Sequence, residues 1–425
     1  MIRTGRLNLW FSETHGQNAT HRPALSIQAV IITIAVLMAS VYTGCTDVVR
    51  KPAKDEVMDQ ISGFSFPRFS DDLNYDGLAH CISQSLIYLR KIPEDRMFVF
   101  GSDRYDTPHM IRSLEYFLEY IQSKPSPRDL KKFIKANYRV YRSVGRDGRG
   151  EVLYTGYYEP HLRGSLWQSD QYPYPIYARP QDLIAIDLSL FSDKYKGEEI
   201  VGRYTDHTVI PYHDREDIES QNALAGKAEV LAWVNDPIDV FFLQIQGSGK
   251  VYLDNGEVIN VHYQATNGRP YRSIGQLLID ENKITNEEMS MQKIRAYLSA
   301  HPEEMEYVLN YNPSYVFFKI EPDGPLGNIN VRLTPGRSIA LDRTIFPPAA
   351  LAYINTQKPL IDSAGNITGW CDFSRFALNQ DTGGAITGPG RADLFWGNGS
   401  YAEIAAGHLK YPGKLYFLVL KPNKS

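Results

Sequence analysis

The sequence QDTGGAITGPGRADLFWGNG fills residues 380–399, and ALD stands before it at residues 340–342. Three aspartates, Asp342, Asp381 and Asp393, therefore stand among glycines and apolar residues. A carboxyl group beside a low-dielectric surface can keep its proton near neutral pH and act as a general acid. Aspartate next to glycine also caps turns, so Asp342 and Asp381 have a structural explanation as well.

Strand-like patterns dominate the central and C-terminal parts of the chain. Residues 151–158, EVLYTGYY, are β-branched and aromatic, and residues 228–242 continue as strands into residues 244–253, QIQGSGKVYL. The sequence DNGE at residues 254–257 is a hairpin turn signal. Short strands return from residue 331 onward, so we predict a mainly β fold of the α+β class.

Helical periodicity appears near the N-terminus and once more in the middle of the chain. Apolar residues recur at intervals of three and four over residues 78–89 and 110–121, and residues 129–138 follow a proline breaker. Residues 274–310 form a further helical stretch, in which Thr285 begins a capping-box sequence. These patterns predict an N-terminal helical cap on a β-rich body.

Composition excludes several classes of protein. The 425 residues are 43% hydrophobic and 22% charged, which is the balance of a globular protein and not of a disordered or polytopic membrane protein. Lys and Arg number 45 against 49 Asp and Glu, and no long basic block occurs downstream of the N-terminus, so we expect no nucleic-acid partner. The 28 tyrosines suit either β-rich packing or a surface that contacts sugars or peptides.

The first 44 residues have the layout of an export signal. Residues 27–39, IQAVIITIAVLMA, are apolar, follow basic residues, and are too few to span a bilayer as a helix. The sequence VYTGC ending at Cys45 resembles a bacterial lipobox, although Tyr42 stands where leucine is usual, and a plain signal peptide is the alternative. Export implies an oxidising compartment, where Cys81 and Cys371 either form a disulfide or remain free thiols.

The sequence lacks residues that the common cofactor-binding and metal-binding motifs require. Gly249 and Lys250 lack the first glycine and the following Ser or Thr of a phosphate-binding loop. The glycines near residue 388 lack the third glycine of a dinucleotide fingerprint, and no H-E-x-x-H spacing occurs among the ten histidines. We therefore expect neither a cofactor nor a metal.

Five segments together resemble the membrane-bound lytic murein transglycosylase A family with its C-terminal three-aspartate module. They occur in the family's order between about residues 154 and 420 and are residues 154–160, 242–249, 312–318, 340–342 and 380–399.

The resemblance implies a double-psi β-barrel domain with an inserted all-β second domain and a groove at their junction. It implies the following division of the chain: a lipoprotein-type signal peptide (1–44), a tether (45–70), the helical cap with the first part of the barrel (71–156), the inserted β domain with its helical stretch (157–327), and the C-terminal part of the barrel (328–425).

The resemblance also implies cleavage of the β-1,4 bond between N-acetylmuramic acid and N-acetylglucosamine in peptidoglycan, with formation of a 1,6-anhydro end. The catalytic aspartate of the family falls on Asp393, and Asp381 and Asp342 match the other two aspartates. One carboxyl group can suffice, because the C6 hydroxyl of the substrate is the nucleophile, whereas hydrolytic glycosidases need a second carboxylate.

Polar and aromatic residues in the matching segments are candidate contacts to the glycan. The alternative for residues 244–249 is a tight Gly-Ser hairpin, and the alternative for each aromatic residue is core packing. The candidates are Thr155, Tyr157, Tyr158, Gln244, Gln246, Gly247, Ser248, Gly249 and Trp396.

Three other functions compete with this interpretation. A hydrolase would pair Asp393 with Asp381 or Glu159 as the base, and a lipoprotein that only binds murein would need no acid. An aspartic protease would use the D-T-G at residues 381–383, but no second such triplet occurs in the chain.

We expect a protein of the cell envelope that faces the periplasm, held in the outer membrane by a lipid on Cys45. Its expected partners are peptidoglycan strands and a complex of cell-wall synthesis or division proteins.

Overall fold

The computed structural model describes residues 53–195 and 197–422. The expected signal peptide, Cys45 and the start of the tether lie outside the described residues. No helix in the described part of the chain has the length and apolarity that crossing a membrane requires.

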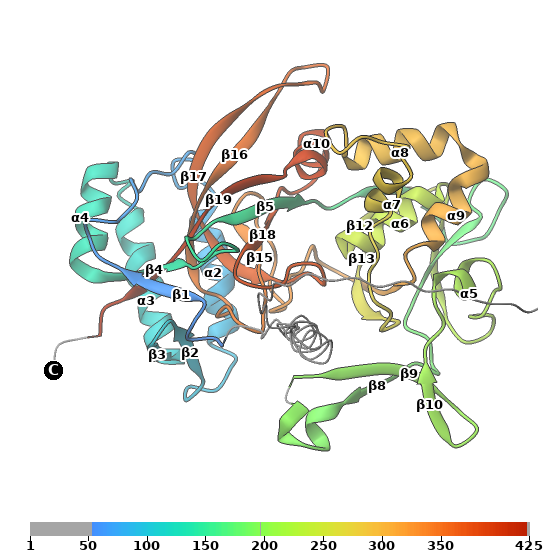
Figure 1. Ribbon diagram of the computed structural model, residues 1–425, viewed down its shortest axis with the longest axis horizontal. Coiled ribbons are helices and arrows are strands. Elements are labelled where there is room, and N and C mark those ends of the chain that lie inside the picture. Colours follow the sequence, from blue (N-terminus) through green and yellow to red (C-terminus); the bar gives the residue numbers. More distant parts are fainter. Residues whose placement is uncertain (1–52, 196, 423–425) are drawn as a thin grey trace, which may run out of the picture. The chain divides into compact units, whose positions relative to one another are not determined.

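A closed six-stranded barrel forms the centre of the described chain (Figure 1). Its strands pair in the order β19-β16-β17-β15-β18-β5, and β5 pairs with β19 to close the ring. The pairs β15–β17 and β18–β5 are parallel, and the other pairs in the ring are antiparallel. The bounds are β5 (Val152–Tyr157), β15 (Ser338–Ala340), β16 (Leu351–Ile361), β17 (Ile367–Asp381), β18 (Arg391–Phe395) and β19 (Tyr411–Leu420).

Two N-terminal strands extend the barrel sheet from β19. Strand β4 (Tyr138–Ser143) pairs with β19, and β1 (Met58–Ile61) pairs with β4. The barrel is closed by β5 and β19, which are far apart in the sequence, so it cannot form until both strands are present.

Three helices pack on the barrel core as their periodicity predicts. In α2 (Leu78–Leu89) the buried residues are those at the predicted spacing, and α3 (Thr107–Ile121) and α4 (Pro127–Asn137) also bury their apolar faces. Asp106 caps α3 and Ser126 caps α4 through their side chains. A hairpin of β2 (Met97–Phe100) and β3 (Asp103–Asp106) precedes α3.

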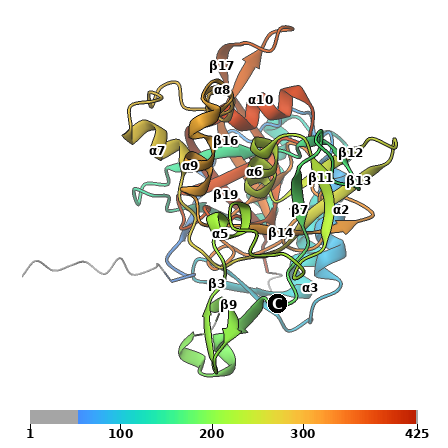
Figure 2. The same cartoon turned by 90° about the vertical axis from the view of Figure 1, so that its right-hand side faces the viewer.

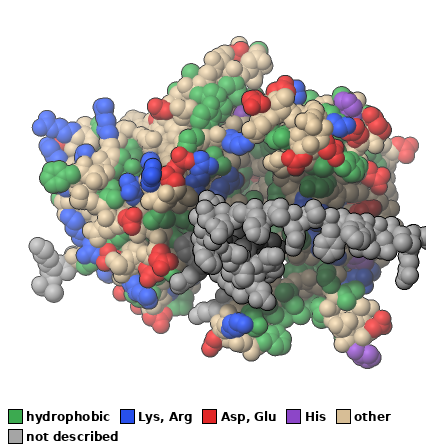
Figure 3. All heavy atoms as spheres, in the orientation of Figure 1, with side chains coloured by type: hydrophobic (Ala, Val, Ile, Leu, Met, Phe, Trp, Pro, Cys, Tyr) green, Lys and Arg blue, Asp and Glu red, His purple; other side chains and the backbone are tan. Residues whose placement is uncertain are grey.

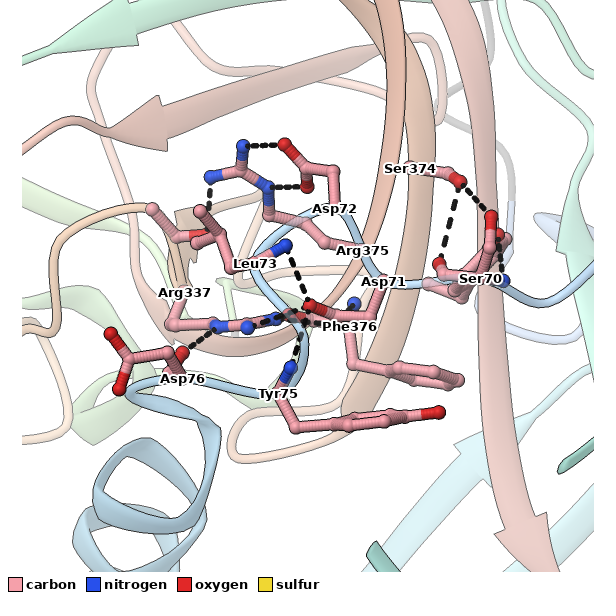
Figure 4. Close-up of polar contacts among 12 residues, drawn as sticks. Ser70, Asp71, Asp72, Leu73, Tyr75, Asp76, Arg337, Ser374, Arg375 and Phe376 are labelled. Carbon is pink, nitrogen blue, oxygen red and sulfur yellow. Dashed lines mark hydrogen bonds and ion pairs between the residues drawn. The ribbon is translucent and has the colours of Figure 1, made fainter. Parts of the chain in front are cut away.

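A short segment before α2 is tied to the barrel by ion pairs (Figure 4). The guanidinium of Arg337 binds both carboxylate oxygens of Asp71 at 2.6 and 2.8 Å, and both side chains are fully buried. Arg375 binds Asp72 through Nε and Nη2 at 2.8 and 2.7 Å. Because Arg337 directly precedes β15 and Arg375 lies in β17, these pairs fix the segment against two barrel strands.

The chain between β5 and β15 forms a second sheet with the order β14-β13-β12-β6-β11-β7. The hairpin predicted at residues 254–257 joins β12 to β13 and is confirmed. Strands β12 and β6 are parallel, and the other neighbours are antiparallel. The bounds are β6 (His161–Ser165), β7 (Tyr174–Tyr177), β11 (Val230–Val234), β12 (Ser248–Leu253), β13 (Val258–Thr266) and β14 (Val316–Glu321).

A separate three-stranded sheet also belongs to this insertion. It is formed by β8 (Ile184–Asp187), β9 (Glu199–Thr205) and β10 (Thr208–Pro211). Apolar side chains gather on the surface at the bottom of Figure 3. Tyr204 in β9 and Phe191 in the connection from β8 to β9 are exposed.

The insertion is not all β, because five α-helices lie in it. Helix α6 (Pro237–Gln246) packs on β7, β11 and β12 (Figure 2). The helical stretch predicted at residues 274–310 is confirmed as three α-helices, although Thr285 caps a turn and Ser290 caps the helix that follows. The other helices are α5 (Arg215–Glu219), α7 (Ile274–Asp280), α8 (Met291–Ala300) and α9 (Met305–Asn310).

The prediction of a strand at residues 237–246 was wrong, and its ends explain why the segment is helical. The side chain of Asp236 accepts a hydrogen bond from the Ile238 N–H, and Pro237 occupies the first helical turn. Gly247 ends the helix with φ 80°, a left-handed conformation that glycine adopts without strain.

The two cysteines in the described chain are free thiols. Cys81 is buried in α2, and Cys371 is partly exposed in β17. Of the two alternatives for this pair, the structure therefore has the free thiols.

Candidate active site

Strand pairing places the three aspartates at one end of the barrel strands. Ala340, the last residue of β15, is paired with Asp381 of β17 on one side and with Asp393 of β18 on the other. Asp342 follows β15 directly, and Asp393 is also paired with Thr155 of β5. Residues far apart in the sequence thus meet around Ala340.

The carboxylate of Asp381 is held by three donors. The Tyr157 hydroxyl donates to Oδ2 at 2.8 Å, while the N–H groups of Thr382 and Asn328 donate to Oδ1 at 2.8 and 2.9 Å. Burial raises the pKa of Asp381 to about 6, and these donors act against that rise. The network fixes the orientation of the carboxylate and leaves little of it available for another partner.

The carboxyl group of Asp393 has a different environment. Its Oδ1 atom is buried and has no hydrogen-bond partner among the described residues. Burial raises the pKa of Asp393 to about 6, and the negative charge of Asp381 adds to the rise, while Thr155 and Arg391 oppose it. A carboxyl group that is weakly held and titrates near neutral pH can both give and take a proton.

Asp342 fixes a turn. Its Oδ1 accepts hydrogen bonds from the Thr344 N–H at 2.9 Å and the Thr344 hydroxyl at 2.6 Å, and its Oδ2 accepts from the Gly388 N–H at 2.7 Å. These contacts join the loop after β15 to the glycine-rich loop before β18. The turn-capping explanation therefore accounts for Asp342.

Trp396 belongs to the core beneath this site. Only 8% of the residue is exposed, and a β-carbon built on Gly156 would lie 2.5 Å from its Nε1 atom. The indole therefore packs directly on the glycine of β5, and its Nε1 is buried with no hydrogen-bond partner in the described chain. This packing does not support the predicted stacking of a sugar on Trp396.

Residues 244–249 lie in the insertion and contact the end of barrel strand β5. The Oε1 atom of Gln246 accepts the Tyr158 N–H at 2.9 Å, at the point where β5 ends. Gly247 caps α6, so the alternative of a tight Gly-Ser hairpin is wrong. The Gly247 carbonyl accepts the Tyr263 N–H at 2.7 Å. Ser248 is buried at the start of β12.

Two further candidates in this segment are engaged in packing. Gln244 is buried, and its Oε1 accepts a 2.6 Å hydrogen bond from Arg215. A β-carbon on Gly249 would lie 2.6 Å from Leu243 Cδ1, so glycine is needed there for close packing. The structure does not support direct glycan contacts by Gln244 or Gly249, because neither has a free surface.

The candidates in β5 differ in accessibility. Thr155 is partly exposed and stands beside Asp393 in the strand register. Tyr157 is 9% exposed and donates to Asp381, and Tyr158 is 6% exposed. Thr155 is thus the candidate in this strand best placed to reach a ligand, while Tyr157 acts on Asp381.

Asn328 contributes to the site and was not predicted. It acts through its backbone N–H, so its side chain carries no signal in the sequence. The neighbouring Gly327 does carry one, because a β-carbon there would lie 2.3 Å from the Gln380 carbonyl oxygen.

Glu159 lies buried where β5 leads into the insertion. Its Oε2 accepts a hydrogen bond from Asn398 Nδ2 at 3.0 Å and lies 3.5 Å from Lys250 Nζ. These partners make it a joint between the barrel and the insertion, and they engage one of its two oxygens.

No group of three or more His, Cys, Asp or Glu residues in the described ranges could hold a metal ion.

Comparisons with known proteins agree with this architecture. The family model described as "MltA specific insert domain" matches residues 153–319, and that described as "3D domain" matches residues 337–419. Membrane-bound lytic murein transglycosylase A of Escherichia coli strain K12 is 31% identical over 307 residues, which cover 72% of this chain and 74% of that protein.

Solved structures show the same fold. A membrane-bound lytic murein transglycosylase from Agrobacterium tumefaciens has a TM-score of 0.69 and 29% identity, covering 86% of this chain and 98% of its own. The structure of E. coli MltA with bound chitohexaose has a TM-score of 0.65 and 24% identity over 88% of this chain and 97% of its own, and at that identity it supports the fold alone.

Proposed function

This chain belongs to the membrane-bound lytic murein transglycosylase A family and is a peptidoglycan lytic transglycosylase, and we propose that Asp393 is its general acid and base. The observation that carries this proposal is the contrast between the two neighbouring acids. Asp381 is engaged by three donors, whereas Asp393 has a buried oxygen without a partner in the described chain.

The reaction requires one carboxyl group to act twice. Protonated Asp393 gives its proton to the glycosidic oxygen as the bond between that oxygen and C1 of the muramic acid breaks. The resulting carboxylate then removes the proton of the C6 hydroxyl, whose oxygen bonds to C1 and closes the 1,6-anhydro ring. No water is consumed, and Asp393 ends protonated again.

A pKa near 6 suits both steps of this mechanism. A group titrating near the pH of the reaction is a competent acid when protonated and a competent base when ionised. In this proposal Asp381 positions and tunes Asp393, because its charge raises the pKa of the neighbouring group.

Partly exposed polar residues are the best candidates for binding the glycan. We propose Thr155 beside Asp393, with Gln246 at the junction with the insertion, since both are partly exposed. The 31% identical Escherichia coli relative, a membrane-bound lytic murein transglycosylase, supports a murein glycan as the ligand.

The finer description of the fold is also part of this proposal. The two parallel pairs, β15–β17 and β18–β5, within a closed six-stranded ring are consistent with a double-psi barrel. In this description α2, α3 and α4 are an N-terminal cap, and the divisions at residues 156 and 327 lie near the changes from barrel to insertion and back. The predicted tether up to residue 70 includes β1, which pairs with β4 and so belongs to the folded sheet.

The protein acts in the cell envelope, as its membrane-bound relatives indicate. We propose that a lipid on Cys45 anchors it in the outer membrane, where a cell-wall synthesis or division complex would be its partner. We expect Cys45→Ser to abolish its recovery in the membrane fraction. Unchanged processing and fractionation of the Ser variant would refute the anchor.

The catalytic proposal is tested with Asp393→Asn. The amide keeps the shape of the side chain but cannot exchange a proton, so murein cleavage should fall by about 10² to 10⁴. Turnover on purified murein and a thermal melt of the same preparation measure activity and folding together. A folded Asp393→Asn variant with wild-type turnover would overturn the assignment.

Analysis of the wild-type products separates this enzyme from a hydrolase. Anhydro ends are lighter than hydrolytic ends by the mass of one water, so mass spectrometry distinguishes them. A reducing end without the anhydro ring would require an activated water and hence a second base. Neither Asp381 nor Glu159 is favoured for that role, because hydrogen bonds and an ion pair already engage them.

A further inference from the structure

A pocket lies in the insertion, apart from the aspartates of the barrel. It has a volume of about 990 Å³ and is lined by β7, α5, β11, the start of α6 and α9. Neither Asp381 nor Asp393 lines it, and no barrel strand contributes to it. Its volume is in the range of ligand sites in proteins.

A buried cation lies at this pocket. Arg215 is 2% exposed, and its guanidinium donates to the Asn312 carbonyl at 3.0 Å and, through Nη2, to Gln244 Oε1 and the Ser314 carbonyl at 2.6 Å. Its Nη1 makes no hydrogen bond to a described residue, and the nearest carboxylate oxygen, Glu219 Oε1, is 4.0 Å away. Buried charges are normally paired more closely than this.

A second group beside this cation is weakly held. The Tyr315 hydroxyl is buried, makes no hydrogen bond of normal geometry to a described residue and has the Glu219 carboxylate beside it. The Tyr315 ring centroid lies 5.1 Å from the guanidinium carbon of Arg215. The buried polar groups around Arg215 are thus incompletely satisfied by the protein itself.

The rest of the lining combines aromatic and acidic side chains. Tyr174, Tyr177 and Trp233 contribute aromatic surface, and Glu219 and Glu306 contribute carboxylates. A ligand matching this lining carries a carboxylate for Arg215, an ammonium group for the acids, and apolar surface between them.

We propose that this pocket binds the short peptides attached to the glycan strands of peptidoglycan. The inference rests on the proposed function, which makes peptidoglycan the substrate, and it adds a peptide site to the glycan site. Such peptides carry free carboxylates and amino groups, which match the charges of the pocket. The bound peptide need not belong to the sugar being cleaved, because the two sites share no residue.

The test measures binding of the pentapeptide L-Ala-γ-D-Glu-L-Lys-D-Ala-D-Ala by calorimetry. We expect Glu219→Gln and Trp233→Ala each to raise its Kd about tenfold, the effect of losing one charged contact or one buried ring. Glu216→Gln is the matched control, because Glu216 lies on the same helix, is exposed and does not line the pocket. A Kd that is unchanged in both pocket variants, or no binding by wild type, would overturn the proposal.

A kinetic measurement separates this inference from the catalytic one. Two substrates are compared: intact murein, and the same murein stripped of its peptides by an amidase. The ratio of the KM for intact murein to the KM for stripped murein should rise at least about threefold in the pocket variants. An unchanged ratio would refute the peptide site while the enzyme still cleaves both substrates. If chitohexaose, and not the peptide, loses affinity in Trp233→Ala, the pocket binds sugar and the proposal is wrong.

Discussion

Asp393 and Asp381 flank the same residue of β15, yet the surroundings of their carboxyl groups differ. Burial raises the pKa of both to about 6. Three hydrogen bonds orient Asp381, whereas Asp393 has a buried oxygen without a partner in the described chain. The two carboxyl groups have similar pKa values, so what distinguishes them is the number of hydrogen bonds that the fold provides to each.

This difference predicts the pH dependence of the reaction. Asp393 must be protonated at the first step, so kcat/KM should fall as the pH rises through about 6. The charge of Asp381 raises the pKa of Asp393, so Asp381→Asn should lower that pKa and move the alkaline limb to lower pH. The pH profile of kcat/KM for the folded variant, beside its melting curve, is the measurement.

Asp342→Asn is the control for this shift. Asp342 fixes a turn and does not contribute to the pKa of Asp393, so its variant should keep the alkaline limb in place even if it is less stable. A limb that moves to higher pH in Asp381→Asn would mean that Asp381 does not act through its charge.

At the scale of elements, helix α6 shows where sequence patterns mislead. Its residues Ile238, Val240, Phe241, Phe242, Leu243 and Gln244 are buried. A helix buried over most of its surface has little polar face to reveal a period of 3.6, and its aromatic and β-branched residues favour a strand. The end signals, Asp236-Pro237 and Gly247, were the better guide.

The end of α6 gives a prediction at this scale. Gln246→Ala removes the acceptor for the Tyr158 N–H, so the free energy of unfolding should fall by about 1 kcal/mol. Gln246→Glu keeps an acceptor oxygen and should stay close to wild type. Urea unfolding of both variants measures the difference, and equal losses in the two would show that the hydrogen bond is not responsible.

Turnover of the same two variants tests whether Gln246 also contacts the glycan. Suppose that Gln246→Ala is folded under the assay conditions but has lower turnover, while Gln246→Glu keeps wild-type turnover. That result would support a role of Gln246 in positioning the end of β5. The sequence alone suggested a glycan contact for Gln246, and the observed hydrogen bond adds a structural role.

At the scale of the molecule, the sequence predicts local structure better than it predicts contacts between residues that are far apart in the chain. The spacing of Leu78, Cys81 and Leu86 matches the buried face of α2, and the segments of the family identify the acids. The pairing of β15 between β17 and β18 has no local signal, since it joins residues about 40 to 55 apart by sheet register. The burial of Trp396 against Gly156 depends on the same long-range closure.

The buried pair of Asp71 and Arg337 joins the segment before α2 to the start of barrel strand β15. Asp71 also accepts hydrogen bonds from the N–H groups of Leu73, Tyr75 and Phe376 (Figure 4). The carboxylate is therefore needed both as a charge and as a set of acceptors.

Arg337→Met leaves this carboxylate buried without its cation, so it should lower the free energy of unfolding by about 3 to 5 kcal/mol. Adding Asp71→Asn removes the charge while keeping an acceptor oxygen for the loop, and the double variant should be more stable than Arg337→Met alone. Urea unfolding curves of the two variants, compared at equal slopes, measure this rescue. If the second substitution lowers stability further, the cost of Arg337→Met arises from its lost hydrogen bonds to the Asp76 and Phe376 carbonyls and not from the unpaired charge.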